Sequence, residues 1–153
     1  MKSVIIIPAR YASSRYIGKP LALLTLPDGS QKSLIEMSYE TACKVVGIDA
    51  VYVATDDSRI ANAAKDFGAE VIMTSDTCRN GTERCAEAME LAGLEADLVI
   101  NLQGDAPLTP PWFIEDLIRA MQADPSADMA TPVLRLDKET YALFREDRLN
   151  NRV

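Results

Sequence analysis

The chain has 153 residues, of which 48% are hydrophobic and 25% charged, as is typical of one globular domain with a substantial core. It contains no histidine, which excludes His-dependent triads, histidine metal ligands and imidazole bases. The net charge of −7 argues against a general nucleic-acid binder. No apolar stretch is long enough to span a bilayer and no secretory signal precedes the first predicted strand, so no membrane partner is expected and the cytoplasm is the default compartment.

The charge is unevenly distributed. Residues 1–27 hold four basic residues and no acidic one, which leaves 12 basic and 23 acidic residues for the rest of the chain. A positive segment on an acidic protein predicts a small polyanionic ligand rather than a long nucleic acid. The three cysteines, Cys43, Cys78 and Cys85, show no metal-ligand or redox spacing, and we expect them to be free thiols.

The first twenty residues, M-K-S-V-I-I-I-P-A-R-Y-A-S-S-R-Y-I-G-K-P, carry the first functional signal. The apolar run at residues 4–7 predicts a central strand buried on both faces, and ligands of open α/β sheets bind past the carboxyl ends of such strands. Three cations follow it, Arg10, Arg15 and Lys19, and cations interleaved with serines suit a polyphosphate. Neither G-x-x-x-x-G-K-[ST] nor G-x-G-x-x-G follows this strand, and ordinary solvated charges at a strand exit are the alternative interpretation.

Strand and helix patterns alternate along the rest of the chain. A hairpin is predicted around the turn at residues 27–30. The predicted strands after residue 7 are 50–55, 70–74, 98–102 and 129–134, the last with Pro132 at an edge or bulge. The predicted helices are 33–46, one ending at residue 67, one from Asn80 to residue 91, one from about 110 to 122, and 137–148. This βαβ pattern predicts a three-layer, Rossmann-like α/β fold with a mainly parallel sheet and helices on both faces.

Helix starts also carry predictions. Asp56 or Asp57 is expected to cap the second helix. Asn80 is expected to cap the third, with Glu83 reaching back as in a capping box.

Asp105 is the second candidate site residue. It follows the strand at 98–102 and comes after Gly104, which allows close backbone approach. If the first and fourth strands are neighbours, Asp105 faces Arg10 and Lys19 across the sheet edge. A carboxylate beside phosphates suits Mg²⁺, and Gln103 is placed to hydrogen-bond a ribose or a base edge. The alternative is a simple turn aspartate.

Four ordered motifs carry a resemblance to a known family. They are I-P-A-R-Y-A-S-S-R-Y-I-G-K-P-L, V-A-T-D-D, M-T-S…N-G-T-E-R and N-L-Q-G-D. Together they strongly resemble the CMP-Kdo synthetases, or 3-deoxy-manno-octulosonate cytidylyltransferases, of the nucleotide-diphospho-sugar transferase superfamily. The resemblance covers essentially the whole chain, and CMP-sialic acid synthetases are more distant relatives.

The resemblance implies a nucleotidyltransferase that moves CMP from CTP to the anomeric hydroxyl of Kdo, an acidic sugar, and releases pyrophosphate, for lipopolysaccharide synthesis. It implies catalytic roles for Arg10, Lys19 and Asp105, with Asp105 as a Mg²⁺ ligand. The nucleotide-binding residues that it implies are Pro8, Ala9, Arg10, Ser13, Arg15, Lys19, Asn80, Gly81, Thr82, Arg84 and Gln103. The family habit is a homodimer.

Two departures from the family keep alternatives open. Ala106 stands where the family usually has glutamate after Q-G-D. Family members also continue well past residue 153, so we expect residues 1–153 to be the nucleotide-binding, N-terminal portion of the domain, without the sugar-binding portion. CMP-sialic acid synthesis, amino-Kdo as the acceptor, and a non-catalytic CTP-binding module remain alternatives.

Overall fold

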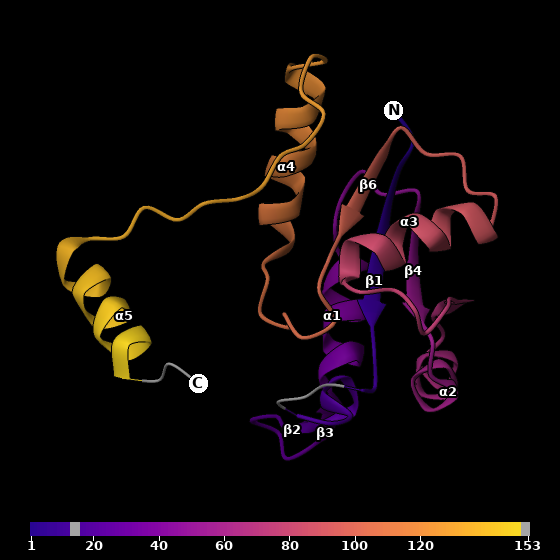
Figure 1. Ribbon diagram of the computed structural model, residues 1–153, viewed down its shortest axis with the longest axis horizontal. Coiled ribbons are helices and arrows are strands. Elements are labelled where there is room, and N and C mark those ends of the chain that lie inside the picture. The colour runs from indigo at the N-terminus through magenta and orange to yellow at the C-terminus, as the bar shows by residue number, and fades with distance from the viewer. Residues whose placement is uncertain (13–15, 151–153) are drawn as a thin grey trace.

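The computed structural model describes residues 1–12 and 16–150 (Figure 1). Its strands are β1 (Ser3–Ala9), β2 (Leu23–Thr25), β3 (Gln31–Ser33), β4 (Ala50–Thr55), β5 (Glu70–Met73) and β6 (Leu98–Asn101). Its helices are the short 3₁₀-helix η1 (Lys19–Leu21) and α1 (Leu34–Ala42), α2 (Ser58–Asp66), α3 (Gly81–Leu91), α4 (Pro111–Ala123) and α5 (Lys138–Asn150). The predicted alternation of strands and helices is confirmed.

The centre of the fold is β1, whose seven residues are all buried. It pairs in parallel with β4 on one side and β6 on the other, in a sheet ordered β5-β4-β1-β6. A strand flanked on both edges and covered on both faces needs apolar side chains throughout, which the run at residues 4–7 supplies. The first and fourth strands of the parallel sheet are therefore neighbours, as the placement of Asp105 required.

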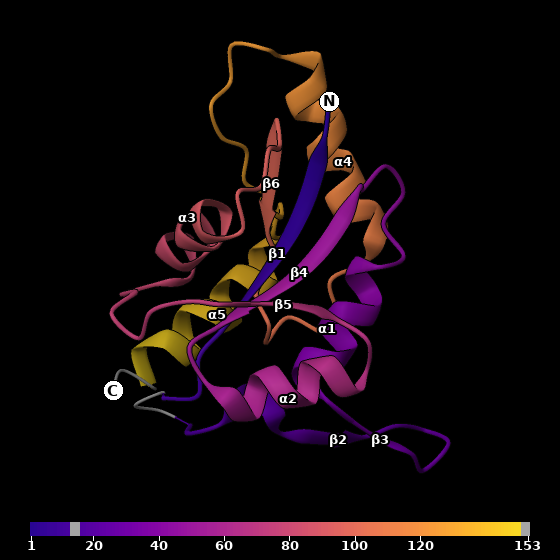
Figure 2. The ribbon, with the colours of Figure 1, turned by 90° about the vertical axis from the view of Figure 1, so that its right-hand side faces the viewer.

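Helices cover both faces of the sheet (Figure 2). Ile5 and Ile7 of β1 pack in one core cluster with residues of α1, α2 and α4. Ile6 points to the opposite face and packs with Cys85 and Ala88 of α3. The alternation of side chains along β1 thus fixes three layers, and the predicted fold class is confirmed.

Two local predictions were partly wrong. The first helix ends at Ala42 rather than residue 46, because the chain continues in turns whose amides reach back three residues, from Lys44 to Thr41 and from Val45 to Ala42. A full capping box is present at Ser33 and Glu36, at the start of α1, where none was predicted. At α3, Asn80 caps as expected, but the Glu83 carboxylate accepts from the Arg79 amide.

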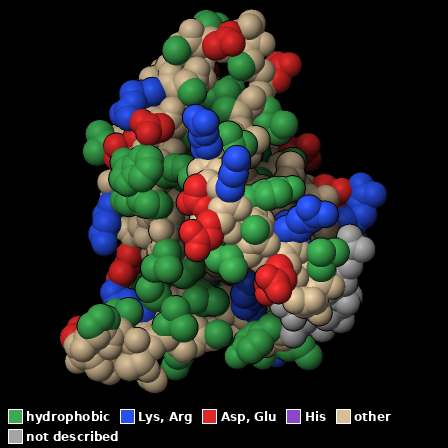
Figure 3. Space-filling model, turned by 90° about the vertical axis from the view of Figure 1, so that its left-hand side faces the viewer, with side chains coloured by type: hydrophobic (Ala, Val, Ile, Leu, Met, Phe, Trp, Pro, Cys, Tyr) green, Lys and Arg blue, Asp and Glu red, His purple; other side chains and the backbone are tan. Residues whose placement is uncertain are grey.

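The predicted strand at residues 129–134 is absent, because these residues are extended and exposed and have no strand partner. Pro132 lacks the N–H that a sheet requires, and the segment runs away from the sheet toward α5 (Figure 1). The predicted final helix is confirmed as α5, which has no buried residue. The face that carries α5 shows hydrophobic side chains interspersed with charges of both signs (Figure 3).

Among the described residues, no helix combines the length and the apolar character that a membrane span requires.

Candidate functional site

A cleft of about 430 Å³ opens past the carboxyl ends of β1 and β6. Three segments form it, namely the end of β1 with the loop that follows, the turn that leads into α3, and the loop after β6. The residues that line it are Pro8, Ala9, Arg10, Tyr16, Lys19, Pro20, Cys78, Arg79, Asn80, Gly81, Arg84, Gln103, Gly104 and Asp105. The position is that expected for a ligand site in an open parallel sheet.

Lys19 and Asp105 meet at the rim of this cleft. Lys19 Nζ lies 2.5 Å from Asp105 Oδ2, and the two side chains are 46% and 43% exposed. An ion pair this exposed contributes little to stability, so its interest lies in where it holds the charges. The hypothesis that the cationic loop and Asp105 converge on one place therefore agrees with the geometry.

The loop after β1 is held at its far end by Gly18. This residue has φ +70° and is buried, and its amide donates to the Tyr11 carbonyl at 2.9 Å. Lys19 begins η1, in which Pro20 is buried against the body of the protein. Arg10 is exposed at the start of the loop and also lines the cleft. Ser13 and Arg15, also predicted to bind the nucleotide, lie outside the described residues.

The beginning of α3 packs tightly against the floor of the cleft. The Asn80 side chain accepts from the Glu83 amide at 2.9 Å and so caps the helix. A Cβ at Gly81 would lie 3.0 Å from Pro8 Cγ and 3.1 Å from Gln103 Nε2. Only glycine allows this approach without a shift, so Gly81 brings the positive end of the helix dipole to the cleft.

Gln103 is oriented by neighbouring side chains. Its Nε2 donates to Asn101 Oδ1 at 2.7 Å, and Asn101 Nδ2 donates in turn to the Thr82 hydroxyl at 3.4 Å. Within the described part of the chain no hydrogen bond to Gln103 Oε1 is found, so this oxygen is available to accept one from a ligand. Gly104, next along the chain, is buried, and a Cβ there would lie 3.3 Å from the Pro8 carbonyl oxygen.

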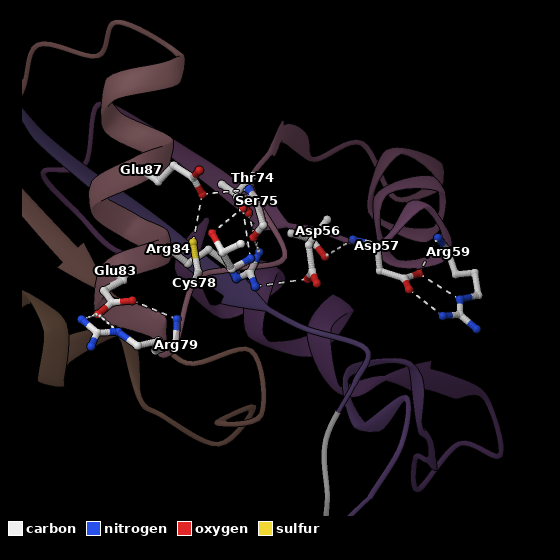
Figure 4. A network of polar contacts seen from close by, with 12 residues as sticks. Asp56, Asp57, Arg59, Thr74, Ser75, Cys78, Arg79, Glu83, Arg84 and Glu87 are labelled. Carbon is white, nitrogen blue, oxygen red and sulfur yellow. Dashed lines mark hydrogen bonds and ion pairs between the residues drawn. The ribbon is translucent and has the colours of Figure 1, made fainter.

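Arg84 differs from the other predicted site residues, because its side chain is only 3% exposed (Figure 4). Nη1 donates to the Thr74 hydroxyl at 2.5 Å and to the Ser75 carbonyl at 3.3 Å. Nη2 lies 3.2 Å from Asp56 Oδ1, a buried oxygen that accepts no hydrogen bond within the described part of the chain. Arg84 thus joins α3 to the carboxyl ends of β4 and β5 while also reaching the cleft wall.

Cys78 contributes a thiol to the wall of the cleft. Its Sγ donates to Glu87 Oε2 at 2.9 Å, and the same oxygen accepts from the Ser75 amide (Figure 4). Burial raises the pKa of this thiol, and the hydrogen bond to Glu87 and its negative charge raise it further. Cys78 is therefore held as a neutral thiol, which argues against a nucleophilic role.

Several residues that line the cleft were missed from the sequence. Tyr16 and Arg79 are exposed at its edge, and the Arg79 guanidinium pairs with Glu83, one helical turn on. Arg79 directly precedes the helix-capping Asn80, and that position was the only available signal. Nothing in the spacing pointed to Tyr16.

The donor set fits a metal ion that arrives with a ligand rather than one held by the protein alone. Of the described residues that line the cleft, Asp105 alone is acidic. Within residues 1–12 and 16–150, no group of three or more acidic or cysteine side chains is suitably placed to hold a metal ion. Mg²⁺ is commonly bound through one or two carboxylates together with phosphate oxygens, and Asp105, beside the cations that line the cleft, meets that requirement.

A three-layer fold with a cationic loop and one carboxylate past the carboxyl ends of its parallel strands is typical of nucleotide-binding proteins. Sequence comparison identifies the family. A sequence model of the cytidylyltransferases matches residues 4–150, so the chain belongs to the cytidylyltransferase family. The chain is 47% identical over 150 residues to the 3-deoxy-manno-octulosonate cytidylyltransferase of Maricaulis maris. That alignment covers 98% of this chain and 56% of the relative.

Two further relatives are informative. The 8-amino-3,8-dideoxy-manno-octulosonate cytidylyltransferase of Shewanella frigidimarina is 47% identical over 133 residues, which cover 86% of this chain and 52% of that protein. A solved CMP:2-keto-3-deoxy-manno-octonic acid synthetase, complexed with CTP, superimposes with a TM-score of 0.75 at 44% identity. That match covers 82% of this chain and 49% of the other. The chain thus spans about half the length of these relatives.

Proposed function

We propose that this chain is the CTP-binding part of an enzyme that transfers CMP from CTP to Kdo and releases pyrophosphate. The observation that carries the proposal is the convergence of Arg10, Lys19 and Asp105 on one cleft with the start of α3. Family membership and the similarity to CMP-Kdo synthetases over nearly the whole chain support it.

The two ends of the nucleotide occupy different parts of the cleft in this proposal. Arg10 and Lys19 bind the triphosphate, together with Ser13 and Arg15 of the same loop. The backbone of Pro8, Ala9 and Arg10 reads the cytosine. Gln103, the helix start at residues 80–82 and Arg84 bind the rest of the nucleoside. Arg84 also holds the start of α3 to the strand ends through its contact with Asp56.

Asp105 binds Mg²⁺ in this proposal, on the triphosphate side of the cleft. When bound, the ion neutralises phosphate charge and lowers the pKa of the attacking sugar hydroxyl. Lys19 then exchanges its carboxylate partner for a phosphate oxygen, so both charges remain paired. Arg10 and Lys19 stabilise the charge that develops on the departing pyrophosphate, and no protein nucleophile is needed. The absence of histidine is compatible with this chemistry.

The acceptor is proposed from the relatives, about half of whose length the chain spans. The Shewanella relative favours amino-Kdo as a second candidate acceptor, at the same 47% identity as the Kdo enzyme. CMP-sialic acid synthesis and a non-catalytic CTP-binding module are the remaining candidates, and a homodimer remains a prediction of the resemblance.

Calorimetry with CTP, with UTP as the competitor, tests the nucleotide site. Saturable CTP binding that requires Lys19 supports the proposal, and equal binding of UTP contradicts the assigned cytosine-reading role. Pyrophosphate release is then measured with Kdo, amino-Kdo and a sialic acid in turn. CTP binding without release from any of the three would favour the non-catalytic module.

A further inference from the structure

A cation on α2 reaches the loop that follows β1. Arg59 lies in the first turn of α2, and its Cζ is 3.3 Å from the centroid of the Tyr11 ring. Arg59 does not line the cleft, whereas Tyr11 directly follows Arg10, which does. A guanidinium over the face of an aromatic ring is an attractive contact, so α2 and the loop are joined here.

The Arg59 side chain is fixed in this orientation by Asp57. Arg59 Nε donates to Asp57 Oδ1 at 2.9 Å, and Nη2 donates to Oδ2 at 2.5 Å, which makes a two-point contact (Figure 4). Asp57 is itself fixed, because it caps α2 and its amide donates to the hydroxyl of Thr55, a fully buried residue at the end of β4. The guanidinium plane is therefore oriented by the sheet rather than by solvent.

Tyr11 in turn determines the path of the chain into Lys19. The Tyr11 carbonyl accepts from the Gly18 amide at 2.9 Å, and a Cβ at Gly18 would lie 3.0 Å from two carbons of the Tyr11 ring. Gly18 is therefore pressed against the ring, and Lys19 follows it directly. Backbone and side chain of Tyr11 together close the loop that begins at Arg10.

We propose that Arg59 is a positioning residue for the nucleotide, which holds Tyr11 against Gly18 so that Arg10 and Lys19 face the same triphosphate. The inference rests on the proposed function, since it assigns the loop a bound nucleoside triphosphate. Its alternative is a surface contact that contributes only to stability. The fold favours a local role, because α2 is anchored by buried Ile60, Ala61 and Ala64 and the Arg59 side chain is 58% exposed.

The test compares Arg59→Gln with Lys65→Gln, which removes the same charge from an exposed position on the same helix. We expect Arg59→Gln to weaken CTP binding about fivefold in calorimetry while the melting temperature stays close to that of the parent chain. Lys65→Gln should leave CTP affinity within about twofold, because it removes only a distant charge. Equal losses in the two variants would reduce the role of Arg59 to general electrostatics and would overturn the inference.

Substitutions of Tyr11 provide a second test of the inference. Tyr11→Phe keeps the ring and should retain CTP affinity, whereas Tyr11→Leu should lose about as much as Arg59→Gln. The double variant Arg59→Gln with Tyr11→Leu should then lose little more than either single variant, because both act through one contact. Additive losses would contradict the coupling.

Hydrogen exchange of the Gly18 amide separates this inference from the proposed function. Arg59→Gln should accelerate that exchange in the nucleotide-free protein, and Lys65→Gln should not. Unchanged Gly18 exchange overturns the inference even if CTP binds. If Arg59→Gln accelerates the exchange but the parent chain binds no CTP, the proposed function is overturned instead, and with it the nucleotide role of Arg59.

Discussion

Lys19 and Asp105 are separated by 86 positions in the chain, yet Lys19 Nζ and Asp105 Oδ2 lie 2.5 Å apart. The contact arises because β1 and β6 are parallel neighbours, so that the loops leaving their carboxyl ends meet. Each residue neutralises the charge of the other. A bound ligand must either separate the two side chains or contact both of them. Replacement of Lys19 and replacement of Asp105 should therefore have different effects on CTP affinity.

Replacement of Asp105 by asparagine should change the dependence of CTP binding on Mg²⁺. Without Mg²⁺ we expect affinity to be unchanged or higher, because a carboxylate that repels phosphate and competes for Lys19 has been removed. With Mg²⁺ the gain in affinity seen in the parent chain should be largely lost. Calorimetry with and without the ion measures both effects, and Asp116→Asn on α4, which removes an exposed carboxylate paired with Arg119, is the control. A full Mg²⁺ response in Asp105→Asn would exclude Asp105 as the ligand.

Replacement of Lys19 by alanine should weaken CTP binding whether or not Mg²⁺ is present. The loss of one charge-assisted contact is worth about 1.5–3 kcal/mol, or roughly 10- to 100-fold in the dissociation constant. Lys2→Ala removes an equal charge just before β1, at the strand end opposite the cleft, and should have little effect. If the two variants bind CTP equally well, Lys19 does not contact the triphosphate.

Among the charged residues that line the cleft, Arg84 should be the one whose loss destabilises the fold most. Arg84→Met removes the partner of the buried Asp56 oxygen, and breaking a buried pair on one side costs about 3 kcal/mol in the free energy of unfolding. Arg79→Met removes an 84% exposed guanidinium just before the start of α3 and should cost less than about 1 kcal/mol. Chemical denaturation measures both, and adding Asp56→Asn to Arg84→Met should restore part of the lost stability. Similar costs for the two single variants would show that Arg84 is not a structural anchor.

The three cysteines should react with a thiol reagent in a fixed order. Cys43 is exposed and should react first at pH 8. Burial raises the pKa of the Cys85 thiol to about 12, so Cys85 should stay unmodified until the chain unfolds. Cys78 should react slowly, because burial and Glu87 raise its pKa, and CTP should slow it further by filling the cleft.

Glu87→Gln tests the cause of the slow Cys78 reaction. Removal of the carboxylate should lower the pKa of Cys78 toward its ordinary value, which raises the thiolate fraction at pH 8 and therefore the rate. The rate should also rise at a lower pH than in the parent chain. Glu90→Gln, at an exposed position on the same helix, should leave the rate unchanged. If the Cys78 reaction rate is unchanged in Glu87→Gln and altered in Glu90→Gln, Glu87 is not the cause of the slow reaction.

The sequence by itself determined the strands and helices that local chemistry controls. The β-branched run of β1 suits only a buried strand, β4 was predicted with its observed bounds, and Asp57 and Asn80 cap the helices expected of them. The motifs around Arg10 and Asp105 also placed both candidate loops at strand ends. The prediction of a strand at residues 129–134 was wrong, because an extended segment becomes a strand only when another backbone pairs with it.

Tertiary structure alone decided which of these residues meet. The order of the strands brings Lys19 to Asp105, and the packing of α3 on the sheet buries Arg84, which the motif suggested only as a nucleotide contact. The stacking of Arg59 on Tyr11 joins two segments whose spacing carries no signal. Hydrophobic periodicity encodes the face that each element buries, whereas contacts between loop side chains depend on strand order and register, which are set by the chain as a whole.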